Sequence, residues 1–377
     1  MKVLTIGTDR NLFDKRSSVL ERQKEYAKEL EEFHIIVFST KEKNLKLKII
    51  DNLFIYPTNS RSRWFYVFDA WRIGKSIAKE KNLVRGTSVV SAQDPFESGL
   101  VAYLIARKFK LPILLQIHTD FLTRQFKSGL NKVRIIIAKF LIPRAQSIRV
   151  VSNTLAYSIK NQFSSIRDRI RVLPVFVDIE SILNYESKKD IRGDFLQFSS
   201  TILMASRLTK EKRIDIAMRS FEKVLKESPN IGLIIAGEGK ERSNLELLVK
   251  QLNISSNVLF VGWQDDLISY MKMTDIFLLT SEYEGYGMVL IEAGAAGCAI
   301  VTTRVGIAKT DLLKNGENSF VCPVGDVDAL ANRVIELLKD VEKRNLFKRN
   351  IKDSIEKISI TKKEYIKQYI GLLEEIV

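Results

Sequence analysis

The sequence between residues 281 and 297 is SEYEGYGMVLIEAGAAG. An apolar run, Ile276–Thr280, precedes it and predicts a buried strand. Glycines at positions 285 and 287 allow the backbone to approach a ligand closely, because neither carries a Cβ. Met288–Ala296 predicts a helix, and the free N–H groups at its start favour an anion in the preceding turn. The stretch therefore predicts a strand, a glycine turn and a helix that together face a ligand.

Two carboxylates bracket this turn. Glu284 precedes the predicted helix, and Glu292 lies inside it among Ala and Gly residues. A glutamate on so apolar a helix needs a polar partner, because an unpaired buried carboxylate is costly. The alternative interpretation of this stretch is an ordinary βα unit with one loop glutamate and one solvent-facing glutamate.

A pair of cations follows another predicted strand, Ile202–Ala205. Arg207 and Lys212 lie five residues apart at the start of a predicted helix. Two cations in this position can clamp a diphosphate through charge-assisted hydrogen bonds. Their alternative interpretation is solvated loop charge.

The combination of these residues resembles the retaining glycosyltransferases of family 4, which have the GT-B fold. Glu284 and Glu292 fall at the two positions of the family's Glu-x7-Glu signature, and Arg207 and Lys212 match its Ser-Arg-Leu-x-x-x-Lys element. The resemblance implies an α/β protein of two Rossmann-like domains whose parallel sheets face a central cleft.

The resemblance also implies a role for each matching residue. Glu284 would lie at the donor sugar, Glu292 would bind the ribose, and Arg207 and Lys212 would hold the nucleotide diphosphate. The loops near the donor would contain Gly285, Tyr286, Gly287, Gly237 and Glu238, and main-chain atoms around Trp263 and Gln264 would contact the base. No metal and no cofactor are then expected, because the two cations can neutralise the leaving group and the nucleotide diphosphate sugar is a co-substrate.

The first half of the chain matches the family more loosely. Strand Pro112–Ile117 delivers His118, and an Asp94-Pro95 turn precedes it. From the residues alone His118 is an ordinary loop histidine, whereas the resemblance implies that it reaches the donor sugar. The family's first glycine-rich loop is poor here, since residues 7–11 contain one glycine, and residues 306–310 depart from its Gly-Gly-x-x-Glu element.

The predicted organisation is an acceptor-side domain over residues 1–180, a linker over 181–198 and a nucleotide-sugar-binding domain over 199–360. The last helix, about 361–377, is expected to pack back on the first domain. Two cysteines and two histidines give no disulfide framework and little scope for a metal site. The chain begins without the apolar core of a signal peptide and has no run long enough to span a bilayer. We therefore expect a cytoplasmic protein, or one peripheral at the inner face of a membrane.

The positive charge of the chain is concentrated in its first half. Residues 1–180 hold 32 of the 60 basic and 17 of the 45 acidic residues, a net charge of +15, which equals that of the whole chain. Such asymmetry suggests an anionic partner, a membrane or a nucleic acid. No recognised nucleic-acid motif appears, so we expect no nucleic acid.

Two segments of this half could meet a membrane surface. Residues 61–72 are aromatic and basic, and residues 126–143 predict a helix. The helix has an apolar stripe of Phe126, Leu130, Val133, Ile137 and Phe140, flanked by Lys127, Lys132, Arg134 and Lys139. Basic side chains at the edges of an apolar stripe can reach a membrane surface. The alternative is that both segments are ordinary core-facing helices with solvated edges.

The sequence thus predicts a retaining glycosyltransferase that moves a sugar from a nucleotide diphosphate sugar to a glycan or lipid-linked acceptor. Synthesis of a cell-surface polysaccharide, lipopolysaccharide or glycolipid is the expected setting. One alternative is a catalytically silent sugar-nucleotide-binding scaffold at the membrane. A nucleic-acid-binding protein and a GT-B epimerase are further alternatives.

Overall fold

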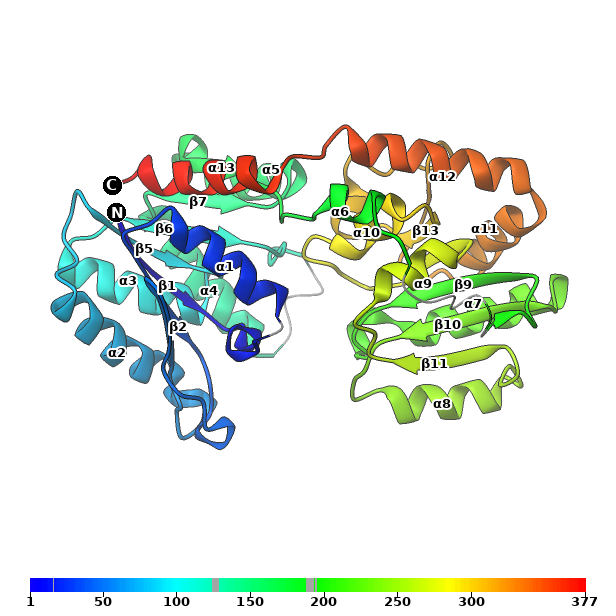
Figure 1. Ribbon diagram of the computed structural model, residues 1–377, viewed down its shortest axis with the longest axis horizontal. Coiled ribbons are helices and arrows are strands. Elements are labelled where there is room, and N and C mark those ends of the chain that lie inside the picture. The colour runs from blue at the N-terminus through cyan, green and yellow to red at the C-terminus, as the bar shows by residue number, and fades with distance from the viewer. Residues whose placement is uncertain (16, 124–128, 188–192, 194) are drawn as a thin grey trace. The chain divides into compact units, whose positions relative to one another are not determined.

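The computed structural model describes residues 1–15, 17–123, 129–187, 193 and 195–377. It divides the chain into two compact units (Figure 1). The first unit contains Met1–Pro174 and Lys362–Val377, and the second contains Val175–Thr361. Each unit is built on a sheet of parallel strands, which confirms the predicted class of two Rossmann-like α/β domains.

The first unit has an eight-stranded sheet in the order β3-β4-β2-β1-β5-β6-β7-β8. Only β3 is antiparallel to its neighbour. The strands are β1 (Lys2–Gly7), β2 (Glu32–Val37), β3 (Lys48–Ile50), β4 (Leu53–Pro57), β5 (Ser88–Ala92), β6 (Ile113–Ile117), β7 (Ser147–Val150) and β8 (Ile170–Val172). The helices are α1 (Ser18–Lys28), α2 (Tyr66–Glu80), α3 (Glu97–Phe109), α4 (Asn131–Leu141), α5 (Asn153–Gln162) and the C-terminal α13 (Lys362–Glu374).

The second unit has a six-stranded, fully parallel sheet in the order β11-β10-β9-β12-β13-β14. Its strands are β9 (Ser200–Ala205), β10 (Ile231–Ala236), β11 (Val258–Gly262), β12 (Ile276–Leu279), β13 (Ala299–Thr303) and β14 (Phe320–Cys322). Its helices are α6 (Ile179–Leu183), α7 (Ile214–Glu227), α8 (Arg242–Gln251), α9 (Leu267–Met273), α10 (Met288–Ala295), α11 (Val327–Lys339) and α12 (Val341–Glu356).

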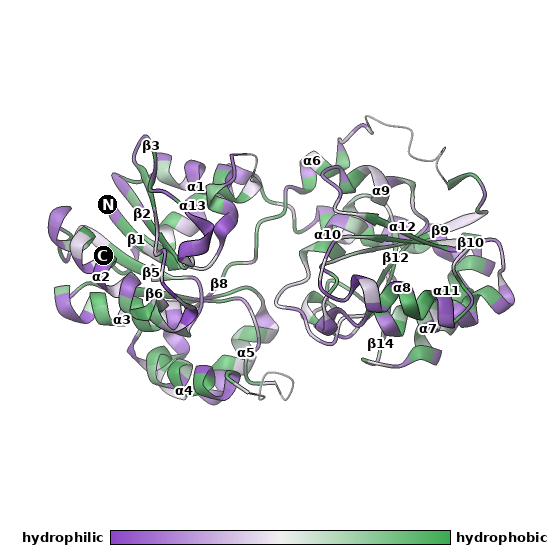
Figure 2. Cartoon of the chain, turned by 90° about the horizontal axis from the view of Figure 1, so that it is seen from below, coloured by the Kyte–Doolittle hydropathy of each residue, from purple (hydrophilic) through white to green (hydrophobic). Residues whose placement is uncertain are grey.

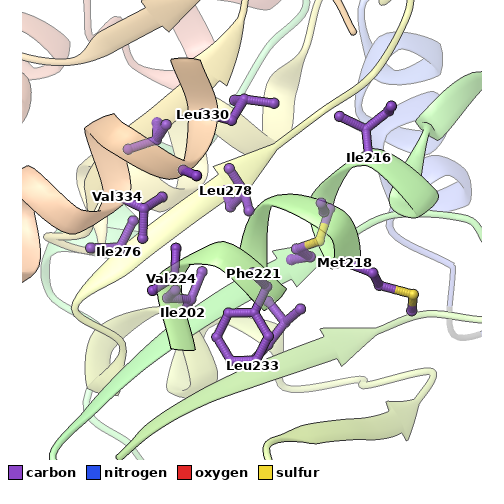
Figure 3. Close-up of a cluster of buried hydrophobic side chains, with 14 of the residues drawn as sticks. Ile202, Ile216, Met218, Phe221, Val224, Leu233, Ile276, Leu278, Leu330 and Val334 are labelled. Carbon is purple, nitrogen blue, oxygen red and sulfur yellow. The ribbon is translucent and has the colours of Figure 1, made fainter. Parts of the chain in front are cut away.

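Hydrophobic strands form the centre of each unit (Figure 2). Strands of a parallel sheet are covered on both faces by helices, so nearly every residue of β1, β9 and β12 is buried. On one face of the second sheet, α7 and α11 meet the strands (Figure 3). The side chains drawn there include Phe221 and Val224 from α7, Leu330 and Val334 from α11, and Ile202, Leu233, Ile276 and Leu278 from the strands.

The order of the strands fixes where a ligand can bind. In each sheet the chain starts in the middle, proceeds to one edge and then returns to build the other half. In such sheets ligands bind outside the carboxyl ends of the strands, where the order reverses. That point lies between β9 and β12 in the second unit and between β1 and β5 in the first. The loops after these strands are therefore the places to look for a site.

The boundary between the units differs from the prediction. The first unit ends at Pro174 rather than at residue 180, and α6, which overlaps the predicted linker, is part of the second unit. Ile179 and Ile182 are buried in the second hydrophobic core, because Asp178 starts a short helix by accepting a hydrogen bond from Ser181 N. Residues 188–192 and 194 of the predicted linker lie outside the described residues.

The buried side chain of Arg149, on β7, contacts the chain both where it leaves the first unit and where it returns to it. Its guanidinium donates to Leu173 O at 3.0 Å and to Pro174 O at 2.8 Å, just before the chain leaves. It also donates to the Tyr365 hydroxyl at 2.6 Å, in the first turn of α13 after the chain returns. Tyr369 of α13 stacks on Tyr26 with ring centroids 4.6 Å apart. These contacts attach α13 to the first unit (Figure 1).

Candidate functional site

A mostly buried ion pair lies at the reversal point of the second sheet. Lys212 follows β9, and Glu284 follows β12. Lys212 Nζ lies 2.6 Å from Glu284 Oε1, and the two side chains are only 14% and 12% exposed. The Ser281 hydroxyl donates to the same carboxylate oxygen at 2.7 Å. The structure thus brings together Lys212 of the predicted cation pair and Glu284 of the predicted glutamate pair.

Backbone contacts hold these two loops together. Thr280 Oγ1 donates to Lys212 O at 3.1 Å and to Arg213 O at 2.9 Å. Glu282 N donates to Glu211 O at 2.8 Å. Hydrogen bonds between the two loops therefore fix the positions of Lys212 and Glu284.

Two glycines shape the loop that carries Glu284. Gly287 has φ +91° and directly precedes α10, a conformation that an L side chain rarely adopts. Gly306, after β13, has φ +51°, and a Cβ on it would lie 2.4 Å from Tyr286 O. Its neighbour Ile307 donates its N–H to that same oxygen at 2.8 Å. Residues 306–310 thus pack against the loop of Glu284, Gly285 and Tyr286 and hold it by a hydrogen bond to Tyr286 O.

Glu292 faces inward from the second turn of α10. Neither a hydrogen bond nor an ion pair reaches its carboxylate from the described residues. Burial raises the pKa of Glu292, because removal from water disfavours the charged form. A carboxylate in this situation is a ready acceptor for a ligand hydroxyl.

Arg207 stands open at the edge of this site. Its side chain is 73% exposed, and its Nη2 lies 3.6 Å from Glu211 Oε1. An exposed pair at that distance contributes little, so the guanidinium can turn to a ligand at small cost. Arg207 and Lys212 therefore differ in kind, since one is accessible and the other is already paired.

The loop after β10 lies against the loop after β9. Gly237 has φ +133°, and a Cβ on it would lie 1.9 Å from Ser206 O. Leu208 N donates to Glu238 O at 2.9 Å. The Glu238 carboxylate is 2.9 Å from Arg242 Nη1, so this residue contributes its backbone to the loop contact while its side chain has a partner.

The two residues predicted to lie at the base follow β11. Gly237 N donates to Gly262 O at 2.6 Å, which joins the ends of β10 and β11. Trp263 is an exposed residue whose Nε1 donates to Asp265 Oδ1 at 3.0 Å. Gln264 Nε2 donates to Val261 O at 2.6 Å. The exposed indole leaves a flat apolar face at this end of the sheet.

His118 lies in the first unit, after β6, at the carboxyl end of that sheet. Burial lowers its pKa to about 3, and the positive charges of Arg149 and Arg22 add to this effect. The imidazole is therefore neutral at any ordinary pH and can act only through hydrogen bonds. Asp94, in the turn before α3, accepts a hydrogen bond from Phe96 N at 2.8 Å, and burial raises its pKa.

Three residues of the site were missed by the sequence analysis. Ser281 contacts the Glu284 carboxylate, Thr280 joins the two loops, and Gly306 supports the loop of Tyr286. Thr280 and Ser281 could have been found as small polar residues directly after a buried strand, and Gly306 as a glycine three residues after the end of β13. Within the described residues there is also no group of three His, Cys, Asp or Glu side chains that could hold a metal ion.

Each of the two units is similar to a known protein family. Residues 193–354 match the family model for glycosyl transferases group 1. Residues 19–181 match the model for Glycosyltransferase Family 4. The two matches fall on the second and the first unit respectively.

Similar proteins have related names. The chain is 28% identical to an N-acetyl-alpha-D-glucosaminyl L-malate synthase of Bacillus anthracis over 71% of this chain and 68% of that protein. It is 26% identical to the N-acetylgalactosamine-N,N'-diacetylbacillosaminyl-diphospho-undecaprenol 4-alpha-N-acetylgalactosaminyltransferase of Campylobacter jejuni, over 72% of each chain.

The fold has a counterpart among solved structures. Anabaena HepE, in complex with UDP-glucose, superimposes over 100% of both chains with a TM-score of 0.77 and 18% identity. At this identity the likeness concerns the fold. The two units are thus each similar to a glycosyltransferase family model, and the structural likeness shows that the chain has the GT-B fold.

Proposed function

We propose that this glycosyltransferase moves a sugar from a nucleotide diphosphate sugar to an acceptor hydroxyl with retention of configuration at the anomeric carbon. The donor would bind to the second unit, outside the carboxyl ends of β9 and β12. The observation that carries this proposal is the mostly buried Lys212–Glu284 pair at 2.6 Å, with the Glu292 carboxylate, which has no partner among the residues that the structure describes, on the following helix. Such an arrangement costs stability in the free protein, and a ligand that supplies phosphates and hydroxyls offsets that cost.

Each residue has a role in the proposed reaction. Arg207 and Lys212 would bind the diphosphate and stabilise the charge that develops as the bond from the anomeric carbon to the phosphate oxygen breaks. Glu284 would accept hydrogen bonds from the sugar, and Glu292 from the ribose. Gly285 and Gly287 would let the loop backbone approach the donor, as Gly237 and Glu238 would from the next loop. Trp263 and Gln264 would contact the base.

The acceptor would attack from the face that the leaving group departs. The acceptor oxygen would form its bond to the anomeric carbon, and its proton would pass to the departing phosphate oxygen, so that no enzyme nucleophile and no separate base are needed. His118, with its low pKa, would contribute a neutral hydrogen bond to the sugar. No metal is required by this scheme, because Arg207 and Lys212 supply the positive charge.

We propose further that the acceptor is presented at an anionic membrane surface. The sequence had left open whether the predicted apolar stripe is buried. Its residues Leu130, directly before α4, and Val133 and Phe140 on α4 are exposed, whereas Ile137 is half-buried. Ile136, which lies off that stripe, is also exposed. Phe126 and Lys127 of the predicted stripe lie outside the described residues. Lys132, Lys139 and Arg144 are exposed beside the stripe, and Arg144 lies over the Phe140 ring at 3.9 Å.

The segment around α2 adds a second part to this surface. Trp64, Phe65 and Phe68 are exposed, with Arg61 and Arg63 beside them. Helix α2 packs against α3, and α3 packs against α4, so both apolar segments belong to one helical layer of the first unit. Exposed aromatic and basic residues in one layer favour a membrane interface. The described helices include none with the length and apolar composition to cross a bilayer.

The membrane part of the proposal is tested by flotation with vesicles. The protein should bind vesicles that contain phosphatidylglycerol at low salt, and binding should fall at high salt as the charges are screened. Replacing Ile136 and Phe140 with Ser should weaken binding, whereas replacing the exposed Leu247 of α8 in the second unit should not. Equal binding to neutral vesicles, or no binding at all, would remove the membrane from the proposal.

The donor part is tested by thermal shift against UDP, GDP, ADP and their sugars. A ligand that binds only the folded protein raises the melting temperature by mass action. A shift with one nucleotide that is lost in Arg207→Ala and Glu292→Ala supports the site. The matched control is Arg219→Ala, on α7 but away from the loops. Transfer or slow hydrolysis of the bound sugar distinguishes the enzyme from a silent scaffold, which would show binding alone.

A further inference from the structure

A pocket of about 550 Å³ opens on the first unit near the end of β1. It is lined by Thr8, Arg10, Phe13, Asp14, Lys43 and Leu45, from the loops that follow β1 and β2. These loops lie at the carboxyl ends of their strands, the edge of the sheet at which α/β proteins bind ligands. The first of these loops, residues 7–11, contains a single glycine.

The loop after β1 is a built structure. After Gly7 the chain forms a short 3-10 turn, Arg10–Phe13, and Asp9 starts it by accepting a hydrogen bond from Asn11 N at 3.0 Å. Lys48 Nζ of β3 donates to Leu12 O at 3.3 Å and to Phe13 O at 3.4 Å, which fixes the end of the turn. The turn therefore holds the Arg10 backbone at the rim of the pocket.

Positive charge converges on this pocket. Arg10 and Lys43 are exposed, and neither forms an ion pair or a side-chain hydrogen bond with any residue that the structure describes. Lys48, whose Nζ donates to Phe13 O at 3.4 Å, adds a third cation next to the lining. Asp14 is the one acidic residue among the six that line it. Cations gathered at an open pocket attract an anion and raise its local concentration.

We infer that this pocket is a subsite for a phosphate group carried by the acceptor. Arg10 offers a planar fork of donors that matches phosphate oxygens, Lys43 offers a point charge, and Thr8 offers a neutral hydroxyl. Phe13 and Leu45 supply an apolar wall for the carbon skeleton next to the phosphate. The inference rests on the proposed function in one respect only, namely that the ligand of the first unit is the acceptor.

The test is calorimetric titration of the full-length protein with inorganic pyrophosphate. Two classes of site are expected. The affinity of the first class for pyrophosphate should fall about tenfold or more in Arg10→Ala and in Lys43→Ala, because each variant loses a charge-assisted hydrogen bond. The other should respond only to Arg207→Ala. Lys108→Ala, which removes an exposed charge from the last turn of α3, should leave both classes unchanged.

Two further arms distinguish the sources of the phosphate. Glycerol 3-phosphate represents a soluble acceptor, and vesicles of phosphatidic acid in phosphatidylcholine represent a lipid. The source whose binding depends on Arg10 and Lys43 is assigned to the pocket. Pyrophosphate binding that is identical in wild type, Arg10→Ala and Lys43→Ala would overturn the inference. So would a single class of site that responds to Arg207→Ala and Arg10→Ala alike, because the two would then hold one shared anion. Nucleotide binding in the thermal-shift experiment is measured separately, so either proposal can fail while the other stands.

Discussion

The Lys212–Glu284 pair makes a quantitative prediction about the second unit. Lys212→Met and Glu284→Gln each remove one charge and leave the other largely buried. Breaking a buried pair costs about 3–5 kcal/mol. Since the side chains keep 14% and 12% of their surface exposed, water reaches them in part, and about 3 kcal/mol is expected. For a unit of this size that free energy corresponds to roughly 6–12 °C in melting temperature.

The double variant is the decisive measurement. Lys212→Met with Glu284→Gln removes both charges, so it should recover most of the stability that either single change loses, with a coupling of about 2 kcal/mol or more. Differential scanning calorimetry on the full chain measures the melting temperature of each variant. The control is the pair Lys339–Glu227, which is 2.8 Å apart but more than half exposed on both sides, and whose cycle should give about 0.2–1 kcal/mol.

The same variants separate stability from ligand binding. The double variant should be well folded yet bind nucleoside diphosphates weakly, because Lys212 is the cation that would meet the phosphates. Single and double changes whose effects simply add, with no coupling, would show that the two groups do not stabilise each other. Undiminished nucleotide binding by the stable double variant would refute the role of Lys212.

Further variants test the helix after this pair, the loop that supports Tyr286, and the attachment of α13 to the first unit. Burial raises the carboxyl pKa of Glu292 in the folded protein above its pKa in the unfolded chain, so the stability that this adds at low pH is lost as the pH rises through the folded-state pKa. Glu292→Gln should therefore leave the free protein equally or more stable at pH 8 and flatten the pH dependence of its stability. Its nucleotide affinity, measured by titration calorimetry, should fall about 10–100-fold, because a hydrogen bond to a charged group is lost. Both Gly306 and Gly316 have positive φ, so an alanine at either position should cost about 1–2 kcal/mol in backbone strain. Gly306→Ala should lower the free energy of unfolding further, because only its Cβ would lie 2.4 Å from a carbonyl oxygen. Chemical denaturation of the two variants measures the difference. Arg149→Met should loosen α13, seen as faster amide exchange in Lys362–Glu374, and unchanged exchange there would show that the guanidinium does not anchor the chain where it leaves and returns.

The local parts of the site could be predicted from sequence, whereas the contacts between its loops could not. Arg207, Glu284 and Glu292 stand out because each sits beside a buried strand or on an apolar helix, and such patterns are local. That Thr280 donates to Lys212 O, and that Lys212 pairs with Glu284, follow only once β9 and β12 are neighbours in the sheet. Strand order is set by packing over the whole unit, which no short pattern contains.

The surface of the first unit illustrates a different limit. The spacing of apolar residues in α4 predicted a helix correctly over Asn131–Leu141, but it could not show which face the stripe would meet. Val133 and Phe140 are exposed, while Ala138 and Leu141 are buried. A short apolar set is enough to attach the helix to α3, and this leaves the longer stripe outside. Periodicity gives the face of a helix, and only the tertiary structure gives its partner.

The charges of the donor site explain why Lys212 is paired in the free protein. Arg207 and Lys212 carry two positive charges, and Glu284 and Glu292 balance them when both are ionised. Lys212 lies in the 2.6 Å pair, largely removed from water, whereas Arg207 is 73% exposed and forms only a long contact with Glu211, so we propose that Arg207 meets an incoming diphosphate first. In the proposed donor complex the phosphates would attract Lys212, and the Glu284 carboxylate, still held by the Ser281 hydroxyl, would then accept hydrogen bonds from sugar hydroxyls. The ion pair would thus link recognition of the diphosphate to recognition of the sugar, because Lys212 can leave Glu284 only when the diphosphate and the sugar supply new partners for both side chains.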